Sequence, residues 1–297
     1  MSQKGFFYSI KKVKILNIGF IGAGKVGCAF GKYLYDKGFK VKGYFSKSFS
    51  SSLKGAKLVK GKAFNDINFL VKESDIIFIT TPDDVIKETS KTIAGLNLSL
   101  NKIFIHMSGA LSSSILRDIK DKGGYVYSLH PLQSFADIKT SVKKLSETVF
   151  SLEGDDEKKE VIKDMLKKLD NKYFLIDSEK KPIYHASACV LSNYLVTLLD
   201  YGFSYLEEIG IDKKEANEAF YPLISVTLEN VRKLGTKKAL TGPIKRGDLD
   251  TIKKHIESIK KESPELLKTY KVLGLETLKL TGDEKFSNEL KNILKEV

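Results

Sequence analysis

The sequence has 297 residues, of which 42% are hydrophobic and 29% are charged, so it is long enough for a sizeable core and two domains. Its net charge of +13 comes almost entirely from lysines that alternate with acidic residues along the chain, which indicates a solvated surface rather than a nucleic-acid interface. No stretch of about 20 apolar residues is present and the N-terminal apolar run is too short for a signal peptide, so we expect a cytoplasmic protein outside the membrane.

The first predicted elements are a strand, a tight turn and a helix. Residues 15–21 form a nearly continuous apolar run, which is typical of a parallel strand buried on both faces. Residues 22–27 then match G-x-G-x-x-G, in which the glycines permit the turn, the approach of a pyrophosphate and the close packing of the helix. The N-terminus of that helix favours phosphate. We therefore predict a dinucleotide site that includes Gly22, Ala23, Gly24, Lys25, Val26 and Gly27.

The end of the second predicted strand, residues 39–45, indicates which dinucleotide is bound. A carboxylate at this place usually binds the ribose 2′-OH of NAD. This sequence has Ser46, Lys47 and Ser48 instead, and two hydroxyls with an ammonium suit a 2′-phosphate. We expect NADP; the alternative is an ordinary polar loop that continues through Ser52.

The following residues alternate between predicted strands and helices. Such alternation predicts an α/β fold with a doubly wound parallel sheet, whose ligand crevice lies at the carboxyl ends of the strands. Thr81 with Pro82, Ser108 and His130 each follow a strand, so we expect them near Gly22 and Ser46 around one crevice. The predicted strands are residues 75–80, 102–106, 125–129, 148–152 and 173–176, and the predicted helices are residues 63–71, a segment ending at 120, and 156–169.

After residue 177 the sequence predicts helices only. Residues 182–209 are apolar on all sides, which predicts a long buried helix. Asp212 with Glu215, and Ser263 before Pro264, read as the starts of two further helices, with a loop at residues 241–248 between them. We therefore predict a Rossmann-like NADP-binding domain over residues 1–178 and an all-α substrate and dimerisation domain over residues 179–297.

Two histidines are candidates for acid–base chemistry. His130 is either at the crevice edge or a structural cap of its strand. His185, Cys189 and Asn193 share one helix face, where they either satisfy polar neighbours in the core or line a cleft. In a cleft, His185 would be the general acid or base and Asn193 would orient a substrate.

Four further residues are candidate substrate contacts. Arg246 either recognises a carboxylate or phosphate or forms a structural clamp with Asp248. No spacing typical of a metal site, a serine hydrolase or a phosphate-binding loop of nucleoside triphosphatases occurs, so we predict no metal. The four candidate substrate residues are Gln133, Tyr184, Thr241 and Arg246.

Six segments, in this order, resemble one family: GFIGAGKVGCAF, TTPDDVI, HMSGALSSSIL, SLHPLQSFAD, YHASACVLSNYLVTLL and ALTGPIKRGD. They are similar to Rossmann-like NADP oxidoreductases with a C-terminal helical domain of unknown function, within the 6-phosphogluconate dehydrogenase-like superfamily. The N-terminal half also resembles deazaflavin-dependent NADP reductases and pyrroline-carboxylate reductases. The resemblance implies a helical second domain and a homodimer built through it.

The resemblance also exposes a departure. Hydroxyacid dehydrogenases of the superfamily carry a catalytic lysine one helical turn before an asparagine. If Asn193 is that asparagine, the lysine position holds Cys189, and His185 is the nearest ionisable substitute. The expected function is hydride transfer between NADP and a small carbonyl or imine compound in an interdomain cleft. The alternative is a non-catalytic NADP-binding redox sensor or partner-binding module.

Overall fold

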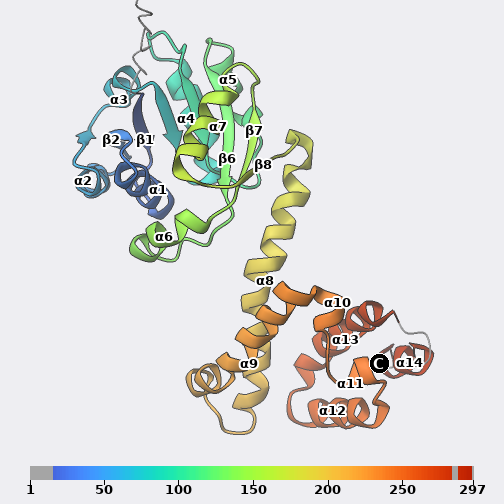
Figure 1. Ribbon diagram of the computed structural model, residues 1–297. Coiled ribbons are helices and arrows are strands. Elements are labelled where there is room, and N and C mark those ends of the chain that lie inside the picture. The colour runs from blue at the N-terminus through green and yellow to red at the C-terminus, as the bar shows by residue number, and fades with distance from the viewer. Residues whose placement is uncertain (1–15, 283–286, 296–297) are drawn as a thin grey trace, which may run out of the picture. The chain divides into compact units, whose positions relative to one another are not determined.

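The computed structural model describes residues 16–282 and 287–295. The chain forms two compact units, which divide between Ser192 and Asn193 (Figure 1). The division falls inside helix α8 (Lys181–Glu207), so the first turns of this helix belong to the N-terminal unit.

The N-terminal unit contains an eight-stranded sheet in the order β3-β2-β1-β4-β5-β6-β7-β8. All neighbouring strands are parallel except β6 and β7. The chain moves outward from β1 to β3 and then returns to the other side of β1, which creates the switch point where such sheets bind ligands. The strands are β1 (Asn17–Ile21), β2 (Lys40–Phe45), β3 (Lys62–Phe64), β4 (Ile76–Ile79), β5 (Ile103–His106), β6 (Tyr125–Pro131), β7 (Phe150–Gly154) and β8 (Tyr173–Leu175).

Helices cover both faces of this sheet, as Figure 1 shows. On one face Phe20 stacks on Tyr44 and Phe78, with ring centroids 5.1 and 5.2 Å apart, and α1 packs over them. On the other face Ile77 and Ile79 belong to a second core. Successive strand residues thus enter opposite cores, which explains the continuous apolar runs. The helices are α1 (Lys25–Asp36), α2 (Phe49–Leu58), α3 (Ile67–Glu73), α4 (Asp83–Ala94), α5 (Arg117–Lys120), α6 (Ile138–Lys144) and α7 (Lys159–Leu169).

The C-terminal unit is entirely helical in the residues that the structure describes. Its core is formed by Ile252, Ile256, Leu278, Leu290 and Leu294. No described helix is both long enough and apolar enough to cross a membrane. After α8 the helices are α9 (Lys213–Leu234), α10 (Thr236–Ala239), α11 (Pro243–Arg246), α12 (Leu249–Glu262), α13 (Leu267–Thr281) and α14 (Ser287–Lys295).

The predicted fold class, a doubly wound α/β sheet followed by helices, is confirmed. Several local predictions are wrong. Residues 63–71 form β3 and then α3, because Asp66 caps the helix by accepting from the N–H of Asn68. Residues 241–248 contain the short helix α11, which Pro243 begins. Helices α2 and α6 were not predicted.

The prediction that residues 182–209 are buried is also wrong for the single chain. Lys181 is the buried residue of α8, and Ile183, Leu191, Tyr194 and Val196 are exposed. The apolar run therefore forms the expected helix, but the described residues of the chain do not cover it.

Candidate functional site

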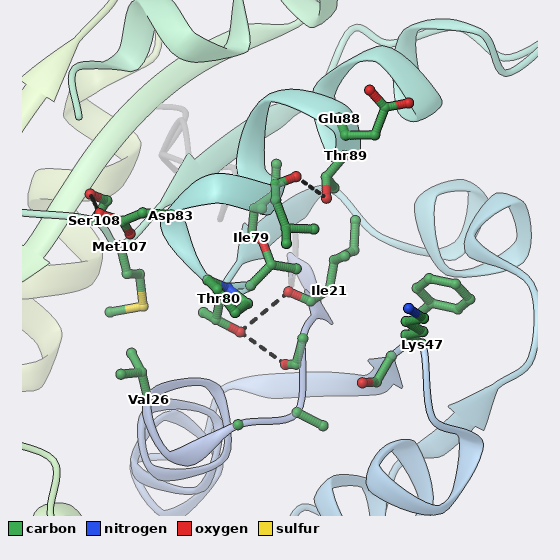
Figure 2. A pocket seen from close by; sticks show the side chains of 18 of the residues that line it. Ile21, Val26, Lys47, Ile79, Thr80, Asp83, Glu88, Thr89, Met107 and Ser108 are labelled. Carbon is green, nitrogen blue, oxygen red and sulfur yellow. Dashed lines mark hydrogen bonds between the residues drawn. The ribbon is translucent and has the colours of Figure 1, made fainter. Parts of the chain in front are cut away.

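A pocket of about 930 Å³ opens at the carboxyl ends of β1, β2, β4 and β5. Figure 2 shows Lys47 on one side of it, Met107 and Ser108 on the other, and Thr80 between them. It lies in the N-terminal unit, at the switch point between β1 and β4. Ten of the predicted cofactor residues line it: Gly22, Ala23, Gly24, Lys25, Val26, Ser46, Lys47, Thr81, Pro82 and Ser108.

The three motif glycines have three different surroundings. Gly22 has φ +103°, and a Cβ atom there would lie 2.7 Å from the backbone of Thr80. Gly27 packs inward, where a Cβ would lie 2.3 Å from Thr80 Oγ1. Gly24, the N-cap of α1, has open space where its Cβ would be. Gly22 therefore makes the turn, Gly24 leaves open the approach of a pyrophosphate, and Gly27 permits the close packing of the helix.

Thr80 holds the turn in place from the neighbouring strand. Its hydroxyl donates to the carbonyl of Gly22 at 2.9 Å, and the N–H of Gly22 donates to the carbonyl of Phe45 at 2.8 Å. The ends of β1, β2 and β4 are therefore tied together beneath the pocket, and the first N–H groups of α1 remain without helical acceptors beside it.

The far side of the pocket is built by the segment after β5. Ser108 Oγ donates to Asp83 Oδ2 at 2.6 Å and accepts from the N–H of Leu111 at 3.2 Å. Asp83 is the first residue of α4, where a carboxylate is favoured by the helix dipole. These bonds connect the start of α4 to the end of β5 on one wall.

A histidine cluster, which we define as His130, Tyr184 and His185, adjoins this wall. His130 Nδ1 lies 2.7 Å from the Tyr184 hydroxyl, and the two imidazole centroids are 6.0 Å apart. Gly109 lies against both rings: a Cβ there would be 2.6 Å from His185 Nδ1 and 2.8 Å from His130 Nε2. The cluster is thus separated from pocket-lining Ser108 by one glycine, although its own residues do not line the pocket.

Burial determines the protonation of this region. It lowers the pKa of His130 to about 4, with further lowering by Lys181 and His185. Burial likewise raises the pKa of Tyr184, so its hydroxyl keeps its proton. His185 Nδ1 is buried without a hydrogen-bond partner in the described residues, and its Nε2 lies 3.6 Å from Cys189 Sγ. At neutral pH the cluster therefore offers a neutral His130 and an unused nitrogen of His185.

Lys181 is the residue of this region that the sequence did not single out. Its side chain is fully buried, and its ammonium donates to the carbonyl of Ser108 at 3.2 Å and to Ser128 Oγ at 2.5 Å. In the sequence it follows Lys180 and precedes Pro182, a context typical of an exposed helix start. Only the contacts that Lys181 makes in the folded chain distinguish it from an exposed lysine such as Lys180.

Other predicted site residues lie elsewhere. Ser48 is the N-cap residue of α2, and its hydroxyl pairs with that of Ser50 at 2.8 Å. Both ends of the Gln133 amide are used within the fold, by Ser141 O and Thr148 Oγ1. These two side chains therefore have structural partners.

The remaining candidates belong to the C-terminal unit. Arg246 lies 3.9 Å from Asp248, as the clamp alternative expects, and both Arg246 and Thr241 are exposed. Asn193 is exposed on α8, and its role in substrate binding stays a prediction. The described residues contain no group of three or more histidine, cysteine or carboxylate side chains that could hold a metal ion.

Comparisons with known proteins agree with this architecture. Protein TM1727 from Thermotoga maritima is 29% identical over 93% of this chain and 98% of its own, with a TM-score of 0.69. The “putative NADP oxidoreductase BF3122” from Bacteroides fragilis is 21% identical over 89% and 98%, with a TM-score of 0.74. Pyrroline carboxylate reductase from Plasmodium falciparum, solved with NADP bound, is 14% identical over 94% and 98%, with a TM-score of 0.57. No curated protein matches the sequence significantly.

Two family models match consecutive parts of the sequence. Residues 3–131 match a Rossmann-like domain. Residues 148–277 match a domain of unknown function, DUF2520. The chain therefore belongs to the proteins that join a Rossmann-like domain to a DUF2520 domain, as its sequence motifs predict.

Proposed function

We propose that this chain is an NADP-dependent oxidoreductase that transfers a hydride to or from a small carbonyl or imine compound. The observation that carries the proposal is the position of the histidine cluster one glycine away from a dinucleotide-sized pocket. Solved structures of the same fold include an enzyme with NADP bound, which supports the choice of cofactor.

The residues of the pocket fit a dinucleotide phosphate. Gly24 leaves open space at the N-terminus of α1, where a pyrophosphate meets free N–H groups. Ser46 and Lys47 line the pocket at the end of β2, where they would bind a 2′-phosphate. Met107 and Ser108 would then contact the nicotinamide end. The bound cofactor supplies the hydride chemistry, and the chain supplies orientation and a proton.

The cluster supplies that proton. A phenol is a better donor than a neutral imidazole, so we assign Tyr184 as donor to His130 Nδ1, which places the His130 proton on Nε2 beside Gly109. The unpartnered Nδ1 of His185 faces the same glycine. His130 therefore orients a carbonyl or imine group, while His185 donates or accepts the proton during hydride transfer.

Calorimetric titration with NADP and NAD tests the cofactor choice. We expect NADP to bind at least about tenfold more tightly, because a hydrogen bond to a charged group contributes about 1.5–3 kcal/mol. Ser46→Asp should weaken NADP binding selectively, since its carboxylate repels the 2′-phosphate, and Ser46→Ala is the uncharged control. Equal affinities of the wild-type protein for both nucleotides would contradict the assignment.

Turnover of a panel of small keto and imino acids with NADPH tests the proton donor. His185→Ala should leave NADPH affinity nearly intact and lower turnover by about 10²–10⁴-fold. His255→Ala is the control, because His255 is exposed on α12 and pairs with Tyr270. If His130→Ala loses turnover while His185→Ala keeps it, the two roles are reversed. NADPH binding without any turnover would favour the redox-sensor alternative.

A further inference from the structure

Lys181 is buried at the point where three elements meet. It begins α8, while its partners Ser108 and Ser128 lie after β5 and within β6. Ser128 Oγ also donates to the carbonyl of Ser108, at 3.3 Å. An ammonium removed from water is costly unless it is fully hydrogen-bonded or paired, so its contacts at this point require explanation.

The contacts of Lys181 reach both halves of the candidate site. Ser108 lines the dinucleotide pocket and holds Asp83 through its hydroxyl. The next residue, Gly109, touches the rings of His130 and His185. A shift of the Ser108 carbonyl would therefore move the pocket wall and the floor of the histidine cluster together.

We propose that Lys181 is a positioning residue of this site. It fixes the Ser108–Gly109 segment between the pocket and the histidine cluster, and it supplies a buried positive charge beside that segment. The role attributed to the histidines rests on the proposed function, whereas the position and charge of Lys181 do not.

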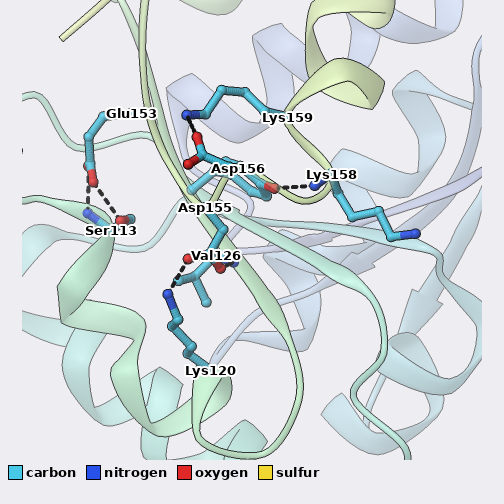
Figure 3. A network of polar contacts seen from close by, with 9 residues as sticks. Ser113, Lys120, Val126, Glu153, Asp155, Asp156, Lys158 and Lys159 are labelled. Carbon is cyan, nitrogen blue, oxygen red and sulfur yellow. Dashed lines mark hydrogen bonds and ion pairs between the residues drawn. The ribbon is translucent and has the colours of Figure 1, made fainter. Parts of the chain in front are cut away.

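The charged groups around Lys181 come from several strands and helices. Burial lowers the pKa of Lys181 to about 8, while Glu153 on β7 and Asp83 on α4 favour its charged form. Figure 3 shows the Glu153 carboxylate accepting from the N–H and hydroxyl of Ser113, at 2.7 and 2.6 Å. Glu153 therefore holds Ser113 in the chain that follows the Ser108–Gly109 segment, while Lys181 holds the carbonyl of Ser108.

Two histidines face the same positive charge. Burial first, and Lys181 second, lower the pKa of His106 on β5 to about 3 and that of His130 on β6 to about 4. Since Lys181 is protonated at neutral pH, its charge disfavours a second cation beside it. The ammonium thus helps to keep His130 neutral, in the form that donates from Nε2.

Histidine NMR titrations of the full chain test this role. Lys181→Met should raise the pKa of His130 by about one unit, because it removes a nearby positive charge that disfavours the imidazolium form of His130. Lys181→Gln keeps donors but no charge and should show the same rise, whereas Lys181→Arg should keep the low value. Lys180→Met removes the same charge from the adjacent exposed residue and should change nothing.

A second measurement tests the anchoring separately. Ser128→Ala keeps the lysine charge but removes one acceptor, so it should weaken NADPH binding severalfold while the His130 pKa stays low. An unchanged His130 pKa in folded Lys181→Met or Lys181→Gln, or unchanged NADPH affinity in Ser128→Ala, would overturn the proposal. If the wild-type chain binds no NADPH, the proposed function fails, and the histidine titration still decides the role of Lys181.

Discussion

Gly24 and Gly27 belong to one motif but face opposite environments, so the same substitution should act on different properties. Gly27→Ala places a Cβ against Thr80 and the Gly22 carbonyl, and overpacking of this kind costs about 1–3 kcal/mol of unfolding free energy. Gly24→Ala meets no atom within 4 Å, and its φ of −78° suits alanine. It should keep stability and weaken dinucleotide binding, because its methyl group occupies the approach of the pyrophosphate.

Urea unfolding and calorimetric titration of the two variants separate these effects. Gly38→Ala is unsuitable as a control because Gly38 has φ +81°. Gly202→Ala is the control, because Gly202 does not have a positive φ and a Cβ atom there would lie in open space. A Gly24→Ala variant that binds NADP as tightly as the wild type would refute the assignment of the open glycine to the pyrophosphate.

At this scale, the sequence predicts residues whose role follows from local backbone geometry. The glycine motif is such a case, because a strand, a turn and a helix are all encoded within one short segment. Lys181 is the opposite case. Residues 180 and 181 are both lysines, and only Lys181 is buried, where it contacts Ser108 and Ser128. Burial of a charged side chain is a tertiary property that no local pattern reports.

Helix α9 illustrates the scale of single elements. Its N-cap Asp212 accepts from the N–H groups of Lys214 and Glu215, both at 2.9 Å, as the capping pattern predicts. Asp212→Ala should therefore destabilise the start of α9 by about 1 kcal/mol. Asp212→Asn should retain the cap, since asparagine is an equally good N-cap residue.

Hydrogen exchange of the amides of residues 214 and 215 measures this effect locally, so it does not require the whole chain to unfold in one step. Faster exchange in the alanine variant and wild-type rates in the asparagine variant are expected. Equal protection in all three proteins would show that the start of α9 is held by packing rather than by its cap.

Elements with a strong apolar pattern are predicted well, whatever their length, and elements without one are not. The buried strands β1, β4 and β5 follow from apolar runs. Helix α2 is not among the predicted helices, because its first turn is Phe49 followed by three serines, a composition that also suits a polar loop. Its burial of Ser52, Gly55 and Ala56 against the sheet shows that small residues, rather than large apolar ones, form its inner face.

At the scale of the whole molecule, the unusual feature is uncovered apolar surface on α8 and α9. Exposed side chains on both helices include large aliphatic and aromatic residues, although monomeric proteins seldom expose contiguous patches of this kind. The sequence predicted burial because such a helix is normally covered. The exposed residues are Ile183, Val190, Leu191, Tyr194, Val196 and Leu198 of α8, and Phe220, Tyr221, Leu223, Val226, Leu228, Val231 and Leu234 of α9.

We propose that a second copy of the chain covers these helices, so that the protein is a homodimer. Light scattering at micromolar concentration should give twice the chain mass. Leu223→Lys should shift the protein toward monomer, because Leu223 is 61% exposed in the single chain and an unpaired ammonium in an apolar interface is costly. Leu53→Lys on α2, where the leucine is 43% exposed on the other unit, is the matched control and should leave the dimer intact. A monomeric wild-type protein would contradict the proposal, and a dimer unaffected by Leu223→Lys but dissociated by Leu53→Lys would move the interface to the sheet-bearing unit.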